Sequence, residues 1–164
     1  MPANNTRQLS HSQNFLRDPK LVERLVAKTD INQNDVIYEI GPGKGIITNQ
    51  MAQHCEKVVA VEYDRNLYNA LSRLFADAKN VEILYGDFLK TDLPSQSEYK
   101  IFSNIPFNLS ADILTKITQA PNPPQCSWLI VQEETAEKYA GAPYGEERFR
   151  SLILKPRFNL QILH

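Results

Sequence analysis

The sequence Glu-Ile-Gly-Pro-Gly-Lys-Gly at residues 39–45 follows the apolar run 36–38 and leads into the apolar segment 46–51. Three of the six glycines of the chain lie in this stretch. A strand that ends in such a turn and enters a helix lets the backbone approach a ligand closely, because glycine has no Cβ and tolerates positive φ. The pattern predicts the first βα turn of a nucleotide-binding α/β domain, with a tight structural turn as the alternative. The third glycine position of the dinucleotide fingerprint is missing, so we expect a nucleoside ligand and not NAD.

The apolar pattern on both sides of this turn predicts alternating strands and helices. Short buried-type runs indicate strands, and apolar residues at helical spacing indicate helices. The expected strands cover residues 36–40, 58–61, 81–85, 99–103 and 128–131, with an alternating sixth at 158–162; the expected helices cover about residues 19–28, 46–55, 65–75 and 110–118. Proline and glycine indicate loops at 121–124 and 141–145. This order predicts an α/β fold with a mostly parallel sheet flanked by helices.

The composition sets limits on the class of protein. With 164 residues, of which 42% are apolar and 23% charged, the chain suits one globular domain with a hydrophobic core. We expect a mobile arm over residues 1–11 and a domain over residues 12–164. The net charge of −1 argues against binding nucleic acid through the charge of the whole surface. An RNA partner would need a local patch, and most of the scattered cations near both ends of the chain are better explained as solvated surface.

The sequence contains no sign of a membrane segment or a metal site. No window approaches the ~20 apolar residues that a membrane-spanning helix needs. Residues 1–8 are polar with no apolar targeting core, so we expect a cytoplasmic protein without a membrane partner. Cys55 and Cys126 match no metal or redox spacing, which favours buried reduced thiols and no bound metal.

Acidic residues follow two of the predicted strands. Glu62 ends the strand 58–61, and its distance from Gly41 is close to the ~20 residues at which an acid accepts hydrogen bonds from ribose hydroxyls. The alternative is a solvated glutamate at a strand end. Asp87 follows the strand 81–85, where it could bond an adenine amino group while Phe88 covers the ring. An ordinary turn with a buried phenylalanine explains the same residues.

The most specific stretch is Asn-Ile-Pro-Phe-Asn at residues 104–108, after the strand 99–103. The exocyclic amine of adenine is a poor nucleophile because its lone pair is delocalised into the ring. Asn104 Oδ1 and the backbone carbonyl of Ile105 can each accept one N–H, which favours a pyramidal nitrogen. Pro106 fixes the local backbone, and Phe107 can stack on an unstacked base, a contact worth about 1–3 kcal/mol. The alternative is an asparagine cap followed by proline before the helix 110–118.

Together these segments resemble the ribosomal RNA adenine N6-methyltransferases, which comprise the erythromycin-resistance (Erm) enzymes and the small-subunit dimethyladenosine transferases. The matching segments are residues 12–16, 39–45, 61–64, 86–88 and 104–107. The resemblance implies a Rossmann-like class I methyltransferase fold, with S-adenosylmethionine as methyl donor. It also implies adenine N6 of ribosomal RNA as acceptor, presented by a base flipped from a loop or bulge.

The resemblance also implies a role for each matching residue. Asn14 and Leu16 would line the methionine end of the donor, and Gly41 and Gly43 would lie against it. Glu62 would hold the ribose. Asp87 would bond the donor adenine, with Tyr63 and Phe88 flanking its ring. Asn104 would approach the donor and orient the target amine, with Phe107 as its catalytic partner.

The branch of the family is indicated by two residues. Ile105 and Phe107 are more like the Erm branch, because the small-subunit enzymes usually carry leucine and tyrosine there. The Erm branch implies methylation of 23S ribosomal RNA and resistance to macrolide, lincosamide and streptogramin B antibiotics. The first alternative is a small-subunit (16S) enzyme, and the second is a donor-binding core with little or no turnover. A nicotinamide oxidoreductase is disfavoured by the glycine spacing and by residues 104–107.

The sequence departs from the family after the expected strand 158–162. Family members continue through a hairpin partner strand, an aromatic-proline motif and a helical C-terminal domain, and none of these is present. We therefore expect a sheet truncated at its last hairpin, in a monomer with an exposed sheet edge. Residues 157–163 would pair directly with the strand 128–131, or that edge would recruit another chain.

Overall fold

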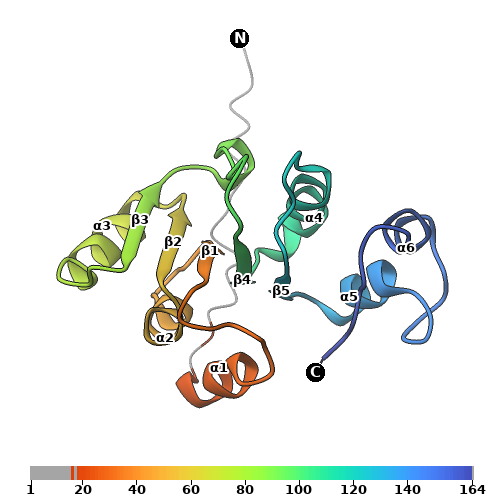
Figure 1. Ribbon diagram of the computed structural model, residues 1–164, viewed down its shortest axis with the longest axis horizontal. Coiled ribbons are helices and arrows are strands. Elements are labelled where there is room, and N and C mark those ends of the chain that lie inside the picture. The colour runs from red at the N-terminus through yellow and green to blue at the C-terminus, as the bar shows by residue number, and fades with distance from the viewer. Residues whose placement is uncertain (1–15, 17, 164) are drawn as a thin grey trace, which may run out of the picture.

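The computed structural model describes Leu16 and residues 18–163, and these form an α/β fold (Figure 1). The predicted arm 1–11 and Asn14 lie outside the described residues. The elements follow one another as α1 Pro19–Val26, β1 Val36–Ile40, α2 Ile46–His54, β2 Lys57–Glu62, α3 Arg65–Leu74, β3 Val81–Tyr85, the 3₁₀ turn η2 Phe88–Lys90, β4 Lys100–Asn104, the 3₁₀ turn η3 Phe107–Leu109, α4 Ser110–Gln119, β5 Ser127–Ile130, α5 Glu133–Ala140 and α6 Phe149–Leu154.

The five strands form one parallel sheet in the order β3-β2-β1-β4-β5. The chain adds β2 and β3 on one side of β1, then crosses to the other side to add β4 and β5. Such a reversal between β1 and β4 is a topological switch point, outside which ligands bind in open α/β sheets. Because all strands run the same way, the residues that follow β1, β2, β3 and β4 lie at one carboxyl edge.

The core has two parts, one on each face of the sheet. Val22 and Val26 of α1 and Ile47 and Met51 of α2 pack on one face. Ile113 and Ile117 of α4 pack on the other face, with residues of β1, β2 and β4. The runs in β2 and β4 are buried on both sides, as expected of a parallel sheet covered by helices.

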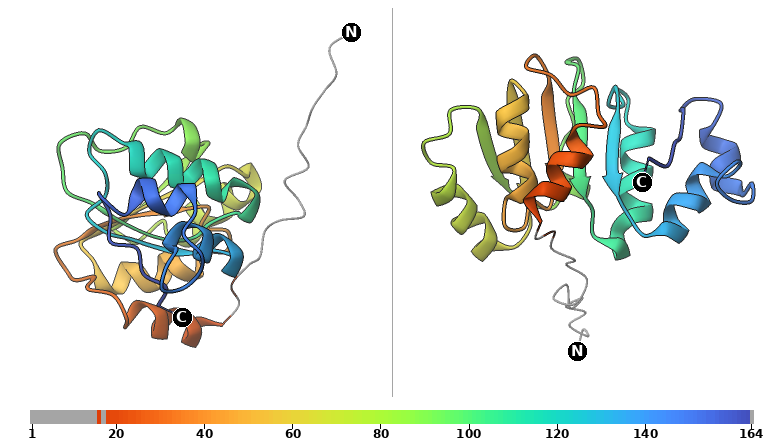
Figure 2. Two further views of the ribbon diagram at one scale, coloured as in Figure 1. Left: turned by 90° about the vertical axis from the view of Figure 1, so that its right-hand side faces the viewer. Right: turned by 90° about the horizontal axis from the view of Figure 1, so that it is seen from below.

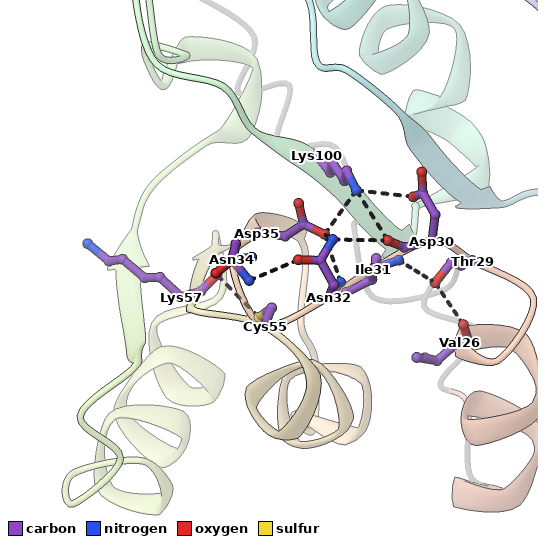
Figure 3. Close-up of polar contacts among 10 residues, drawn as sticks. All are labelled: Val26, Thr29, Asp30, Ile31, Asn32, Asn34, Asp35, Cys55, Lys57 and Lys100. Atoms are coloured by element: carbon purple, nitrogen blue, oxygen red, sulfur yellow. Dashed lines mark hydrogen bonds and ion pairs between the residues drawn. The ribbon is translucent and has the colours of Figure 1, made fainter.

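A polar cluster joins the sheet to the turn before β1 at the opposite, amino edge (Figure 3). Lys100, at the start of β4, forms ion pairs with Asp35 at 2.9 Å and with Asp30 at 3.1 Å. Asp35 also accepts a hydrogen bond from the backbone N–H of Asn32 at 2.8 Å. Burial alone would lower the pKa of the Lys100 ammonium, but the two aspartates outweigh burial and raise its pKa.

The predicted sixth strand is wrong, because residues 158–163 have no strand structure and do not pair with β5. After α6 the backbone N–H groups of Arg157 and Phe158 bond back to the carbonyl of Leu154, and this turns the chain. The tail then reaches the segment that follows α1, where Lys28 Nζ donates to the carbonyl of Leu163 at 3.0 Å. The alternation seen in the sequence remains as alternating exposure along the tail, since an extended chain alternates its side chains without a partner strand.

Two helices after β5, α5 and α6, were not predicted. They lie beside the sheet on its β5 side, with α6 farther out than α5 (Figures 1 and 2). Arg150 Nη1 donates to Thr115 Oγ1 at 3.4 Å, which links α6 to α4. The loop expected at 141–145 does separate the two helices. Within Leu16 and residues 18–163, no helix is both long and apolar enough to cross a membrane.

Candidate active site at the carboxyl edge of the sheet

The glycine turn after β1 has a conformation that depends on its glycines. Gly41, Gly43 and Gly45 have φ values of +64°, +60° and +78°, in the left-handed region that favours glycine. A Cβ at Gly45 would come within 2.9 Å of Leu71 and of Phe75, so this glycine lets α3 pack against the turn. A Cβ at Gly41 would meet no atom within 4 Å. The backbone at Gly41 therefore faces open space that a ligand could occupy.

Glu62 at the end of β2 is bound to this turn. Its Oε2 accepts a hydrogen bond from the backbone N–H of Gly43 at 3.1 Å, and its Oε1 accepts one from Asp64 at 2.8 Å. Burial raises the pKa of the Glu62 carboxyl, and these two hydrogen bonds oppose the increase. The residue is only 3% exposed, so the solvated alternative is wrong. A carboxylate oxygen can accept more than one hydrogen bond, so a hydroxyl of a bound ligand could also donate to Glu62.

A second buried carboxyl, Glu39, lies beneath the same turn and was not assigned a role from the sequence. It is 1% exposed, and its Oε2 accepts a hydrogen bond from Thr48 Oγ1 of α2 at 2.6 Å. Burial raises the pKa of Glu39 to about 8, with the Thr48 bond opposing the increase and the negative charge of Glu62 adding to it. Its place in residues 39–45 was visible in the sequence, but its burial was not.

The end of β4 is tied to the end of β1 through a side chain. The backbone pairing of β1 with β4 covers Ile37 with Lys100 and Tyr38 with Ile101. Beyond that point the hydroxyl of Ser103 donates to the carbonyl of Ile40 at 2.7 Å and accepts from the N–H of Ile40 at 3.2 Å. Ser103 is fully buried. Ser103 therefore fixes the distance between the glycine turn and Asn104, which is the next residue after Ser103.

The chain leaves the sheet after Asn104, the last residue of β4. Asn104 pairs with Ile130 in the register of β4 with β5, and the N–H of Ile105 donates to the carbonyl of Ile130 at 3.3 Å. Pro106 is extended, with φ −60° and ψ 125°, and its carbonyl accepts from Leu109 N–H at 3.0 Å. Asn104 and Phe107 are half-buried, so part of each faces solvent.

The other residues that were predicted to bind the donor differ in exposure and in their contacts. Tyr63 is 59% exposed next to Glu62. Asp87 caps η2 through a hydrogen bond from Leu89 N–H to its Oδ1 at 3.0 Å, and its Oδ2 lies 3.9 Å from Lys90 Nζ. Phe88 is 5% exposed within the core, which corresponds to the buried alternative. Leu16 packs against the core beside α1 and α2.

The cysteines carry reduced thiols. Cys55 is buried, as predicted, and Cys126 is half-buried. Burial raises the pKa of the Cys55 thiol to about 11. Among the residues that the structure describes, no group of three or more histidine, cysteine, aspartate or glutamate side chains could hold a metal ion.

Comparisons with known proteins place this arrangement in a class. The chain superposes on the crystal structure of the 23S rRNA methyltransferase ErmE with a TM-score of 0.79 and 26% identity, over 89% of this chain and 59% of that chain. The parallel sheet with its glycine turn is thus a Rossmann-like methyltransferase fold. The model of the family "Ribosomal RNA adenine dimethylase" matches residues 4–164, and the chain belongs to this family.

Curated relatives carry names from both branches of the family. The "Ribosomal RNA small subunit methyltransferase A" of Levilactobacillus brevis is 34% identical over 163 residues, covering 93% of this chain and 55% of the relative. The "rRNA methyltransferase" of Streptomyces thermotolerans is 37% identical over 135 residues, covering 82% of this chain and 44% of the relative. The chain spans about half the length of the curated relatives it matches.

Proposed function

We propose that this chain is the catalytic domain of an S-adenosylmethionine-dependent methyltransferase that modifies N6 of an adenine in ribosomal RNA. The proposal rests on two sets of hydrogen bonds at the switch point, one made by Glu62 and the other by Ser103. Glu62 bonds Gly43, and Ser103 bonds Ile40, so the glycine turn, the acid of β2 and the Asn104 segment form one connected unit. Membership of the family supports the same reaction.

The donor fits the residues that surround the glycine turn. The open space at Gly41 would admit a ligand against the backbone, and the Glu62 oxygens would accept from ribose hydroxyls; the absence of any atom within 4 Å of a Cβ at Gly41 supports this proposal. Tyr63 and Phe88 would flank the adenine, and Asp87 Oδ2 would accept from its amino group. Leu16 and Asn14 would line the methionine end. The chemistry that the donor supplies is a methyl group on a positively charged sulfur.

The acceptor would be held by the Asn104 segment. Asn104 Oδ1 and the Ile105 carbonyl would each accept one N–H of the adenine amine, which draws its lone pair out of conjugation. Phe107, half-buried after the extended Pro106, would stack on the flipped base. The amine becomes acidic as it is alkylated, so no strong base is needed. Positioning and electrostatics are the contribution of the chain.

We further propose 23S ribosomal RNA as the substrate, with macrolide, lincosamide and streptogramin B resistance as the consequence. The support is Ile105 and Phe107 together with the likeness to ErmE. The second candidate is 16S ribosomal RNA, which is supported by the name of the small-subunit methyltransferase of Levilactobacillus brevis.

The test is transfer of a radiolabelled methyl group to isolated small and large ribosomal subunits and to naked 16S and 23S RNA. We expect label in 23S RNA that is lost in Asn104→Ala and kept in Asn49→Ala, a matched change of an exposed asparagine on α2. Label in 16S RNA alone would identify the small-subunit activity. Donor binding without label in any RNA would identify a donor-binding core.

A further inference from the structure

A hollow of about 650 Å³ lies between the loop after α5 and the tail after α6. Its walls are residues 142–144 on one side and 155–161 on the other. This volume is within about 300–1,000 Å³, the range of small-ligand sites, and the hollow is widely open to solvent. The residues that line the hollow include none of the segment 104–108.

The walls of the hollow are joined by a network of polar contacts. Lys155 forms an ion pair with Glu147, and its Nζ donates to the carbonyl of Ala142 at 2.9 Å. Ser151, fully buried on α6, donates to Glu147 Oε2 at 2.6 Å. A Cβ at Gly141 would come within 2.5 Å of Glu147 Oε2 and 2.7 Å of Ser151 Oγ, so the loop is closely packed on α6. These contacts therefore hold the loop after α5 against α6 and the start of the tail.

The lining combines an aromatic ring, cations and amides. Tyr144 is 39% exposed at the hollow, and the Arg157 guanidinium lies over the Phe158 ring at 5.4 Å. Asn159 and Gln161 line the hollow and are exposed members of the alternating tail. Lys155 and Arg157 are the charged residues of the lining, and no acid is among the lining residues. The charge of Lys155 is already compensated by Glu147, which leaves Arg157 to bind an anion.

Rings, amides and a cation in one hollow match the parts of a nucleotide. Bases stack on aromatic rings without a requirement for sequence, amides pair with base edges, and arginine binds phosphate. We propose that this hollow binds an unpaired nucleotide of the RNA substrate, with its base on Tyr144 and its phosphate on Arg157. The choice of RNA as ligand rests on the proposed function. The hollow would be a second contact that holds RNA while the Asn104 segment holds the target base.

The experiment measures binding of a fluorescent single-stranded RNA of about eight nucleotides, a length within the range of single-strand sites. The variants are Tyr144→Ser and Arg157→Gln. Their matched controls are Phe149→Ser, an aromatic residue 74% exposed on α6 outside the hollow, and Arg73→Gln, an exposed cation on α3. Thermal unfolding of each variant establishes that the fold is kept, and titration with S-adenosylmethionine measures the donor site separately.

We expect Tyr144→Ser to weaken RNA binding by about 5- to 100-fold, as for other base-stacking residues. Arg157→Gln should weaken it and lower the magnitude of the slope of log affinity against log salt by about 0.7, the value for one phosphate contact on a single strand. Donor affinity should not change. Equal losses in the controls, or unchanged affinity in both hollow variants, would overturn the proposal.

The two proposals fail in different ways. If RNA binding depends on Tyr144 and Arg157 but no RNA is methylated, the hollow binds RNA and the proposed activity is wrong. If RNA is methylated and the hollow variants keep wild-type oligonucleotide affinity and KM, the activity stands and the hollow proposal is wrong. Binding of free adenosine monophosphate with the affinity of the oligonucleotide would also overturn it, by identifying a site for a free nucleotide.

Discussion

The N–H of Gly43 donates a hydrogen bond to Glu62 Oε2 at 3.1 Å, so the acid that ends β2 holds the turn that follows β1. Because Asp64 N–H donates to the other oxygen, a glutamine at position 62 would direct its NH₂ group at a backbone N–H. We expect Glu62→Gln to weaken S-adenosylmethionine binding about 10- to 100-fold, the range for losing a hydrogen bond to a charged group. Calorimetric titration measures this change.

The control for Glu62 is Glu82→Gln on β3. Glu82 forms an ion pair with Lys57 at 2.7 Å, and both side chains are 46% exposed. Exposed pairs contribute about 0–1 kcal/mol, so this change should leave donor affinity unaltered. A Glu62→Gln protein with the donor affinity of the control would show that Glu62 only stabilises the turn.

Two glycines of the turn should respond differently to substitution. Gly45→Ala places a Cβ 2.9 Å from Leu71 and Phe75, so we expect a loss of stability of about 1–3 kcal/mol from overpacking, added to the cost of positive φ. In Gly41→Ala the new Cβ meets no neighbouring atom, so stability should fall only by the cost of positive φ, about 1–2 kcal/mol. The same Cβ would obstruct binding of the donor. Urea unfolding and donor titration of both variants separate the two effects. Equal donor affinity of Gly41→Ala and wild type would contradict the assignment of the open space.

The elements around the turn could be predicted because their signals are local. The β-branched run of β2 and the glycine turn each specify their own backbone, and both are present. The sixth strand could not be predicted reliably, because alternation specifies which side chains face outward but not whether a partner strand exists. Phe88 shows the same limit at the site, since no local pattern distinguishes a ring in the core from a ring on a ligand.

Glu39 makes the stability of the fold depend on pH. Its pKa is about 8 in the folded chain and 4.5 as its ordinary value, so between these values the folded state binds more protons than the unfolded state. The free energy of unfolding should therefore fall as pH rises through this window, with a limiting slope of about 1.4 kcal/mol per pH unit. Glu39→Gln keeps an acceptor for Thr48 and should remove this contribution. Denaturant unfolding across the window, compared with Glu82→Gln, measures the difference; parallel curves for wild type and Glu39→Gln would contradict it.

The cluster in Figure 3 should stabilise the fold without affecting the donor site. Lys100→Met removes the cation from Asp35, whose side chain is only 12% exposed, so we expect a loss of about 3–5 kcal/mol. Asp30→Asn should cost about 1 kcal/mol or less, because the Asp30 side chain is 76% exposed. The raised pKa of Lys100 means that its contribution is full below its ordinary value of 10.5 and is lost as pH rises through the folded value. Urea unfolding at neutral pH tests the order of the two variants, and equal losses would contradict it.

Ser103 should act on turnover through the position of Asn104. Its hydroxyl continues the connection between β1 and β4 beyond the last backbone pair, and Ser103→Ala leaves the Ile40 N–H and carbonyl without that partner. Stability should fall by about 1–3 kcal/mol, the cost of unpaired buried groups. Methyl transfer should fall about 10- to 100-fold, because small errors of position cost this much, while donor affinity should change little. Thr118→Ala on α4, which removes a hydroxyl bonded to the carbonyl of Leu114 at 2.6 Å, is the matched control. Equal kcat values in the two variants would show that Ser103 stabilises the sheet without positioning Asn104.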